Sequence, residues 1–214
     1  MRLNKFLAKH TDLSRRKADE AISNGHVTID GKIAVLGNEV KPTSVICLNG
    51  VEIVSKATES RVLLLNKPVG YVCSRDGQGS PTVYDLVGGD TTGLNVAGRL
   101  DKDSSGLVIL TNDGELRNEL THPSRNKQKL YEVTLNHEIS AKHVNMLTSL
   151  GVDIGDERLS KFDKLTRLKP YTYEVCLSEG RNRQIRRTFA ALDYVVKTLH
   201  RTARGAYAVE EASL

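Results

Sequence analysis

A short charged segment, GRLDKDSSG at residues 98–106, contains the acids and bases best suited to chemistry in this sequence. Arg99 stands two residues before Asp101, and Lys102 and Asp103 follow directly. An arginine beside a carboxylate in a partly dry site keeps it ionised, because the guanidinium lowers its pKa. Asp101 is therefore a candidate catalytic carboxylate; the alternative is a turn residue in a weak surface ion pair. Lys102 and Asp103 are interpreted as serving loop solubility or a local turn.

The second charged feature is basic and lies at residues 181–204. It holds seven lysines and arginines and one acid, Asp193, so its excess of six exceeds the net charge of +5 of the whole chain. A local positive field of this kind suits an anionic partner. In GRNRQIRR the arginines surround Ile185, so we expect some of them to point inward, and Asp101 is their natural partner.

Several other kinds of site are excluded by spacing. The sequence contains no GxxxxGK[ST] phosphate loop, no metal-ligand spacing among its six histidines and no nucleophile elbow. Cys47, Cys73 and Cys176 lie in apolar runs and are predicted to be core residues in a reducing compartment. DKDS resembles a phosphatase motif, but Gly98 and Arg99 interrupt the apolar strand that such a motif should follow.

The elements that must position these residues fall into two predicted domains, residues 1–57 and 61–214, with a linker at 58–60 inside the polar stretch SKATES. The first domain is predicted to hold a helix at residues 3–9 and a second helix capped by Ser14 and ending at Gly25. A hairpin then turns at Asp30-Gly31, and a further strand turns at Asn49-Gly50.

The second domain alternates short apolar runs with few helices, which favours an α+β fold with a mixed, mainly antiparallel sheet. The predicted strands are residues 62–65, 71–74, 107–110, 130–135, 173–177 and 194–199, and the predicted helices are residues 115–120, 141–149 and 184–192.

Two resemblances cover nearly the whole chain. RLNKFLAKH, followed by SRRKADEAISNGHVTIDG, resembles the S4 RNA-binding domain. GRLDKDSSGLVILTNDG resembles the signature of pseudouridine synthases, and NKPVGYVCS, KLYEVTL and EGRNRQIRR resemble three further motifs of that family. With its S4-like domain, the chain is similar to the bacterial group that contains ribosomal small subunit synthase A and large subunit synthases B, E and F.

The family resemblance implies an enzyme that needs no cofactor and converts a uridine of 16S or 23S ribosomal RNA to pseudouridine. Asp101 matches the catalytic aspartate of the family. Three routes stay open for this residue: attack at C6 of the base, attack at C1′ of the sugar, or action through a glycal intermediate. Tyr131 matches the tyrosine that lies against the uracil, and Arg186 matches the arginine that pairs with the aspartate. Arg99 matches the residue that fills the space left by a flipped base, and Lys67 is either structural or RNA-facing.

RNA binding is expected from the basic residues of both domains. In the S4-like domain these are Arg15, Arg16 and Lys17, which oppose the helix dipole at a cost of about 0.3–1 kcal/mol each unless they bind phosphate. In the second domain they are Arg99, Arg181, Arg183 and Arg187, with Lys67 as a further candidate. We expect a cytoplasmic monomer that meets ribosomal RNA or pre-ribosomal particles and no membrane; the alternative is a non-catalytic ribosome assembly factor.

Overall fold

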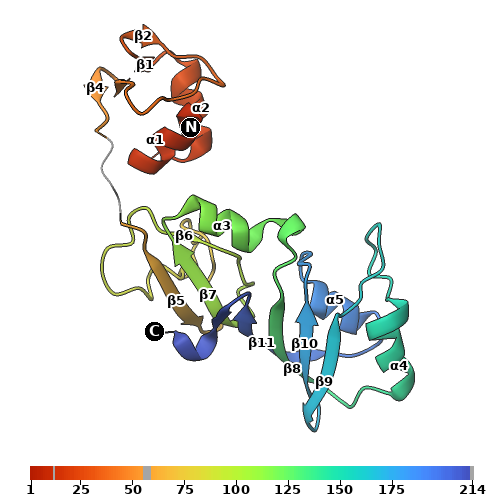
Figure 1. Ribbon diagram of the computed structural model, residues 1–214. Helices are drawn as coiled ribbons and strands as arrows, with labels where there is room; N and C mark the ends of the chain where they lie inside the picture. Colours follow the sequence, from red (N-terminus) through yellow and green to blue (C-terminus); the bar gives the residue numbers. More distant parts are fainter. Residues whose placement is uncertain (12, 55–58, 213–214) are drawn as a thin grey trace. The chain divides into compact units, whose positions relative to one another are not determined.

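The computed structural model divides the chain into two compact units, Met1–Glu59 and Ser60–Leu214 (Figure 1). The structure describes residues 1–11, 13–54 and 59–212. Most of the polar stretch in which the linker was placed, residues 55–58, lies outside the described residues. Within the described part of the chain, no helix is long and apolar enough to cross a bilayer.

The N-terminal unit is a pair of helices on a small sheet, as the sequence predicts. Helix α1 (Leu3–His10) and helix α2 (Arg15–Ser23) precede strands β1 (Val27–Ile29), β2 (Lys32–Ile33), β3 (Ile46–Leu48) and β4 (Val51–Glu52). The strands pair antiparallel in the order β2-β1-β3-β4. The hydroxyl of Ser14 accepts a hydrogen bond from the backbone N–H of Lys17 at 3.2 Å, which confirms the predicted cap of α2.

Both predicted turns of this unit have the backbone that two-residue hairpins require. Asp30 and Gly31 have φ of 51° and 77°, and Asn49 and Gly50 have φ of 51° and 78°. A positive φ at both central positions matches the right-handed twist of the flanking strands. The short strands are therefore held in register by their turns, and the helices cover one face of the sheet with Leu3, Phe6, Leu7, Ala18 and Ile22.

The C-terminal unit is built on a mixed sheet in the order β5-β7-β11-β8-β10-β9, with β6 on β7 and β12 on β11 (Figure 1). Its strands are β5 (Val62–Lys67), β6 (Asn95–Val96), β7 (Ser105–Thr111), β8 (Lys129–Leu135), β9 (Lys164–Lys169), β10 (Thr172–Leu177), β11 (Val196–Arg204) and β12 (Tyr207–Ala208). Strands β7 and β11 pair in parallel, and the other pairs among the described strands are antiparallel. The predicted α+β class is confirmed.

The helices of this unit are short. They are α3 (Gly114–Thr121), α4 (Ala141–Asn145) and α5 (Gln184–Ala190), with η1 (Pro123–Arg125), the π-helical turn η2 (Met146–Leu150) and η3 (Val209–Glu211). The sequence allows either Asn112 or Asp113 to cap α3. In the structure the carboxylate of Asp113 accepts from the backbone N–H groups of Glu115 and Leu116 and so caps the helix.

Two strand predictions need correction, and the six-residue strand β9 was missed. Residues 71–74 form no strand; Val72 makes one isolated bridge to Thr82. The predicted strand at 194–199 begins two residues later and runs to Arg204. Strand β9 was not predicted because KLTRLK has no apolar face, which is typical of an edge strand protected by charge.

Two apolar clusters lie at opposite ends of the large sheet. Helix α5 places Ile185 and Phe189 against Val133 and Val175 of β8 and β10. The second cluster lies over β5 and β7, and includes Leu65, Val108 and Leu110. Tyr131 of β8 packs against both clusters, so it lies where the two halves of the sheet meet.

Candidate active site

The charged loop at residues 98–104 joins β6 to β7, and a buried arginine donates hydrogen bonds to its backbone. Arg201 of β11 is 1% exposed. Its Nη2 donates to the carbonyl oxygen of Gly98 at 2.8 Å, and its Nε donates to that of Leu107, also at 2.8 Å. A longer bond of 3.4 Å runs from its Nη1 to the carbonyl oxygen of Arg99. One side chain therefore joins both ends of the loop to the centre of the sheet.

The two glycines that flank the loop allow this close packing. Gly106 has φ of 104° and lies opposite Arg201 in the parallel β7–β11 pair, where a Cβ would come within 2.2 Å of the Arg201 carbonyl oxygen. At Gly98, a Cβ would lie 2.2 Å from Nη1 of Arg204. Arg204 is 5% exposed, and burial lowers its pKa to about 10. The loop thus needs glycine on both sides of Asp101.

The other side of the loop is fixed by the segment that follows β5. The backbone N–H of Leu100 donates to Sγ of Cys73 at 3.4 Å, and that of Gly70 donates to the carbonyl oxygen of Lys102 at 2.7 Å. Nζ of Lys102 donates to the hydroxyl of Ser80 at 2.9 Å. The NKPVGYVCS motif therefore acts as a support for the charged loop.

An open hollow of about 490 Å³ lies at this loop and is lined by Gly70, Asp101, Lys102, Asp103 and Arg183. This size falls in the range of small-molecule sites, about 300–1,000 Å³. Asp101 is partly exposed at its wall. The geometry therefore presents a carboxylate, with a cation beside it, in an open surface hollow.

The charge pairing in this hollow differs from the prediction. Among the described residues, the ion pair to Asp101 comes from Arg183, whose Nη1 lies 3.5 Å from Oδ2 of Asp101. The same guanidinium donates to both oxygens of Asp103, at 3.0 and 2.7 Å. Arg186, the expected partner of Asp101, places its Nε 3.3 Å from Oδ2 of Asp103. Asp103 therefore receives both arginines, which corrects its interpretation as a solubility or turn residue.

Arg186 is largely buried and ties the loop to β11. Its Nη2 donates to the carbonyl oxygen of Asp103 at 2.7 Å and to the hydroxyl of Ser104 at 3.3 Å, and its Nη1 donates to the carbonyl oxygen of Val196 at 3.2 Å. It shapes the backbone directly after Asp101 instead of pairing with the carboxylate. The physical reason is that a planar guanidinium can bridge several carbonyl oxygens at once.

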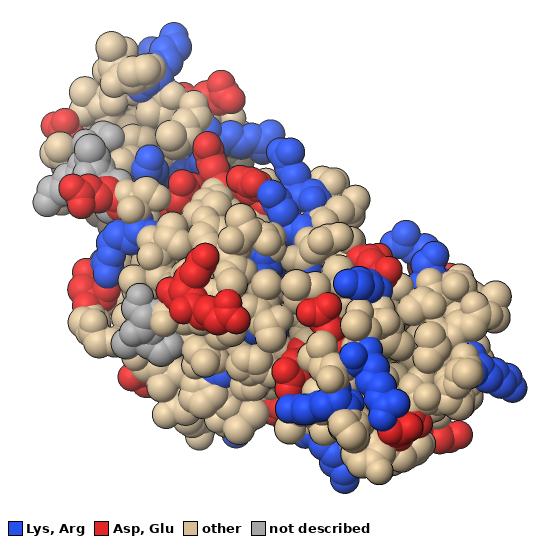
Figure 2. Space-filling model, turned by 60° about the horizontal axis from the view of Figure 1, so that its bottom comes forward, with Lys and Arg blue, Asp and Glu red and all other residues tan. Residues whose placement is uncertain are grey.

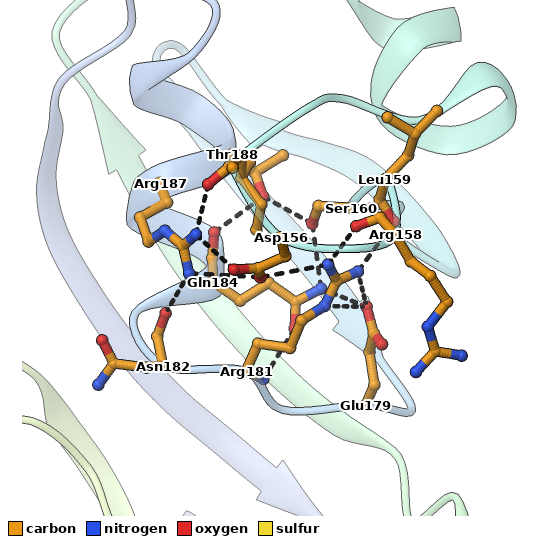
Figure 3. Close-up of polar contacts among 12 residues, drawn as sticks. Asp156, Arg158, Leu159, Ser160, Glu179, Arg181, Asn182, Gln184, Arg187 and Thr188 are labelled. Carbon is orange, nitrogen blue, oxygen red and sulfur yellow. Dashed lines mark hydrogen bonds and ion pairs between the residues drawn. The ribbon is translucent and has the colours of Figure 1, made fainter.

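Two of the basic residues predicted to contact RNA belong instead to an internal network (Figure 3). Arg181 donates to Glu179 at 2.6 Å and lies 3.3 Å from Asp156, and Arg187 donates to Asp156 at 2.7 Å. Gln184 donates to Ser160 at 3.0 Å and to Glu179 at 2.5 Å. The predicted RNA contacts of Arg181 and Arg187 conflict with this arrangement, because their guanidinium groups are engaged by acids and carbonyl oxygens. The network fixes the turn that carries Arg183.

Lys67 also lies inside the protein. It is 0% exposed, and its Nζ donates to the carbonyl oxygen of Pro68 at 2.9 Å. Burial lowers the pKa of this amine, while the nearby thiol of Cys73 and the carboxylates of Asp103 and Asp101 act in the opposite direction. The structural alternative for Lys67 fits this position, and the RNA-facing one does not.

The remaining predicted residues are accessible. Arg99 is exposed beside Asp101 on the loop, and Tyr131 is half-buried on β8. Arg15, Arg16 and Lys17 are exposed in the first turn of α2, where Nη2 of Arg15 donates to the side chain of Asn4 at 3.3 Å. On the face in Figure 2, lysine and arginine atoms lie beside aspartate and glutamate atoms, so much of the positive charge there has acidic neighbours.

Sequence reasoning missed the supporting residues Arg201, Arg204 and Lys129. Lys129 donates through Nζ to the carbonyl oxygens of Lys127, Ser178 and Glu179, and burial lowers its pKa to about 8. A buried cation looks the same in sequence as a surface one. The signal that could have indicated a close neighbour was Gly106 at the start of an apolar strand, because an isolated glycine in a strand indicates a close backbone approach.

Within residues 1–11, 13–54 and 59–212, no three His, Cys, Asp or Glu side chains gather in a way that could hold a metal ion. The hollow beside the charged loop is lined by the carboxylates of Asp101 and Asp103 and by the cations Lys102 and Arg183.

Comparisons with known proteins agree on one family. Residues 61–191 match the family described as RNA pseudouridylate synthase, and residues 1–46 match the S4 domain. Ribosomal small subunit pseudouridine synthase A of Pasteurella multocida is 38% identical over 204 residues, which cover 94% of this chain and 87% of that protein. Dual-specificity RNA pseudouridine synthase RluF of Escherichia coli K12 is 37% identical over 203 residues, covering 94% of this chain and 69% of that protein. A crystal structure of a pseudouridylate synthase superposes with a TM-score of 0.69 at 33% identity, covering 100% of this chain and 93% of that one.

Proposed function

Because the chain belongs to the RNA pseudouridylate synthase family, we propose that it isomerises a uridine of ribosomal RNA, with Asp101 as the catalytic carboxylate. In this reaction the bond from C1′ to N1 breaks, the uracil rotates, and a bond from C1′ to C5 forms. C5 loses its proton and N1 gains one, so no oxidant or reductant is needed. The observation that carries the proposal is the hollow of about 490 Å³ in which Asp101 stands beside Arg183.

The other residues have distinct proposed tasks. Tyr131 lies against the uracil and accepts the C5 proton, and Arg186 holds the backbone that follows Asp101. A uridine in structured RNA must leave its stack at a cost of a few kcal/mol. Arg99 is exposed next to Asp101, and its planar guanidinium suits stacking in the vacated space. The hollow is lined by residues of a single chain, and the relative from Pasteurella multocida is named for the ribosomal small subunit, so we further propose a monomer that acts in the cytoplasm.

The test is a map of pseudouridines in 16S and 23S ribosomal RNA from cells with and without the gene. Carbodiimide-dependent stops of reverse transcription detect the modification, which leaves the RNA mass unchanged. One stop that disappears with the gene and returns with the purified protein supports the proposal and identifies the nucleotide. An unchanged map, with RNA binding retained, would favour the alternative of a non-catalytic assembly factor.

Replacing Arg186 with lysine is expected to slow isomerisation by about 10²-fold, as small errors in catalytic geometry do. A single ammonium cannot bridge the carbonyl oxygens of Val196 and Asp103, so the loop loses a brace. Release of tritium from C5-labelled uridine in RNA measures the rate. Arg167→Lys, on exposed strand β9, is the matched control and should keep the wild-type rate. Equal rates for both variants would remove Arg186 from the active site.

Replacing both Arg15 and Arg16 with alanine is expected to weaken RNA binding and flatten its dependence on salt. Each lost phosphate contact reduces the slope of log affinity against log salt by about 0.7–0.9. Filter binding at several salt concentrations measures both quantities. The double variant Arg167→Ala/Lys169→Ala removes the same charge from β9 and should leave the slope unchanged. Parallel slopes for the two double variants would show that Arg15 and Arg16 are ordinary surface charges.

A further inference from the structure

Asp103 is the residue of the active-site loop for which the proposed mechanism has no task, yet it has the strongest charge contacts there. It accepts two hydrogen bonds from Arg183 and lies 3.3 Å from Nε of Arg186. The hydrogen bonds from Arg183 hold the pKa of the Asp103 carboxyl below its ordinary value. The Asp103 carboxylate therefore binds both Arg183 and Arg186.

Asp101 stands next to the same cation but is bound by it more loosely. The closest approach of Arg183 to Asp101 is 3.5 Å, whereas its bonds to Asp103 are 3.0 and 2.7 Å. A bidentate arginine covers both oxygens of a carboxylate. If Arg183 bound Asp101 in this way, both carboxylate oxygens of Asp101 would face the guanidinium. They would then not face the hollow, where we expect the nucleoside of the substrate.

We propose that Asp103 is a positioning residue that retains Arg183 beside Asp101 and prevents it from covering the Asp101 carboxylate. The proposal rests on the proposed catalytic role of Asp101. Arg183 then supplies a nearby positive charge, while the oxygens of Asp101 remain open to the sugar or base of the substrate.

The fold limits how far Arg183 moves when its anchor is lost. Arg183 precedes α5 and has φ of 48°, on a turn fixed by the network around Glu179, Arg181 and Gln184 (Figure 3). Its backbone stays in place, and its side chain, 41% exposed, keeps rotational freedom. Asp101 is the other carboxylate that this side chain contacts, so it is the expected new partner when Asp103 is neutralised.

The test is a double-mutant cycle that consists of Asp103→Asn, Arg183→Gln and the double variant. For each protein we measure the single-turnover rate, the RNA affinity and the thermal unfolding. Asp103→Asn should slow the rate about 10- to 100-fold while RNA affinity changes less than about threefold, because released Arg183 blocks Asp101. Adding Arg183→Gln should then restore the rate at least threefold, since it removes the blocking group. Asp103→Glu, which keeps the charge, should lie closer to the wild type.

Several results would overturn the proposal. One is a wild-type rate for Asp103→Asn, and another is a double variant that is as slow as Asp103→Asn or slower. A third is an Arg183→Gln variant whose main defect is weaker RNA binding, because Arg183 would then be a phosphate contact. A crystal structure of Asp103→Asn supplies a readout that does not depend on activity. It should show the Arg183 guanidinium on both oxygens of Asp101, and an unmoved Arg183 would contradict the proposal. Absence of product from the wild-type protein would instead contradict the proposed function.

Discussion

Asp101→Asn is expected to reduce isomerisation by about 10⁴-fold or more, to below detection, while RNA affinity stays within about threefold of the wild type. The amide has the same shape as the carboxylate but lacks the negative charge that every proposed route requires near C1′ or C6. Asp101 is partly exposed, and its ion pair to Arg183 is long at 3.5 Å. An exposed pair of this kind contributes little to folding, so the loss should be confined to chemistry.

The control for this prediction is Asp193→Asn, the same change in the acid of the basic segment. Asp193 is exposed and has φ of 65°, a conformation that asparagine tolerates well. Its rate should equal that of the wild type. Tritium release measures the rate, and fluorescence anisotropy with labelled RNA measures the affinity. Residual activity of Asp101→Asn near the wild-type level would exclude Asp101 as the catalytic carboxylate, and lost RNA affinity would show that the change acts through the structure.

The fold was largely predictable because its signals are local. Ser14 and Asp113 each start a helix by accepting hydrogen bonds from nearby backbone N–H groups, and Asp30-Gly31 and Asn49-Gly50 form turns through their own backbone preference. The apolar runs that became β5, β7, β8 and β10 are long enough to indicate buried strands. Residues 71–74 look equally strand-like, but this segment is required as a support for the charged loop and makes a single bridge.

The charged groups of the candidate site could be identified from the sequence, but their ion pairing could not. Asp101 and Asp103 are two residues apart, and Arg183 and Arg186 are three apart, so the spacing allows either acid to face either arginine. The choice depends on side-chain positions that differ by an ångström or less in contact distance, 2.7 Å against 3.5 Å for Arg183. The turn that is fixed by the Glu179–Arg181 network sets the position of Arg183 relative to Asp101 and Asp103. No local sequence pattern predicts this position.

The charge of the basic segment, residues 181–204, also does not show which of its arginines contact a partner. Its excess of positive charge indicates an anionic partner, yet Arg201 and Arg204 are buried, and Arg181 and Arg187 bind acids of the protein itself. These four arginines build the site by bonding to carbonyl oxygens and carboxylates. Net charge alone therefore overestimates how many cations meet RNA. Within this segment, Arg183 is the exposed arginine that lines the hollow.

Gly106→Ala is the change expected to damage the fold most, by about 4 kcal/mol or more in the free energy of unfolding. Gly106 has φ of 104°, which strains any other residue, and a new Cβ would lie 2.2 Å from the carbonyl oxygen of Arg201 and 2.5 Å from its backbone nitrogen. Backbone atoms in the middle of a sheet cannot move aside as a flexible side chain does. The parallel β7–β11 pair must then separate, and Arg201 loses its bonds to the loop that carries Asp101. Since domains of this kind are stable by about 5–15 kcal/mol, this loss is a large share of the total.

Gly114→Ala is the matched control, because Gly114 begins α3 with no heavy atom within 4 Å of a new Cβ and no strained φ. Alanine favours the helix over glycine by up to about 1 kcal/mol, so this variant should equal or exceed the wild type in stability. Urea unfolding followed by circular dichroism measures both proteins, and tritium release at a temperature where both are folded measures the rate. We expect Gly106→Ala to unfold at much lower urea and, where folded, to isomerise slowly because the Asp101 loop has lost its brace. Similar unfolding midpoints for the two variants would show that the β7–β11 pair yields at Gly106, and Arg201 would then not be the rigid support of the active site.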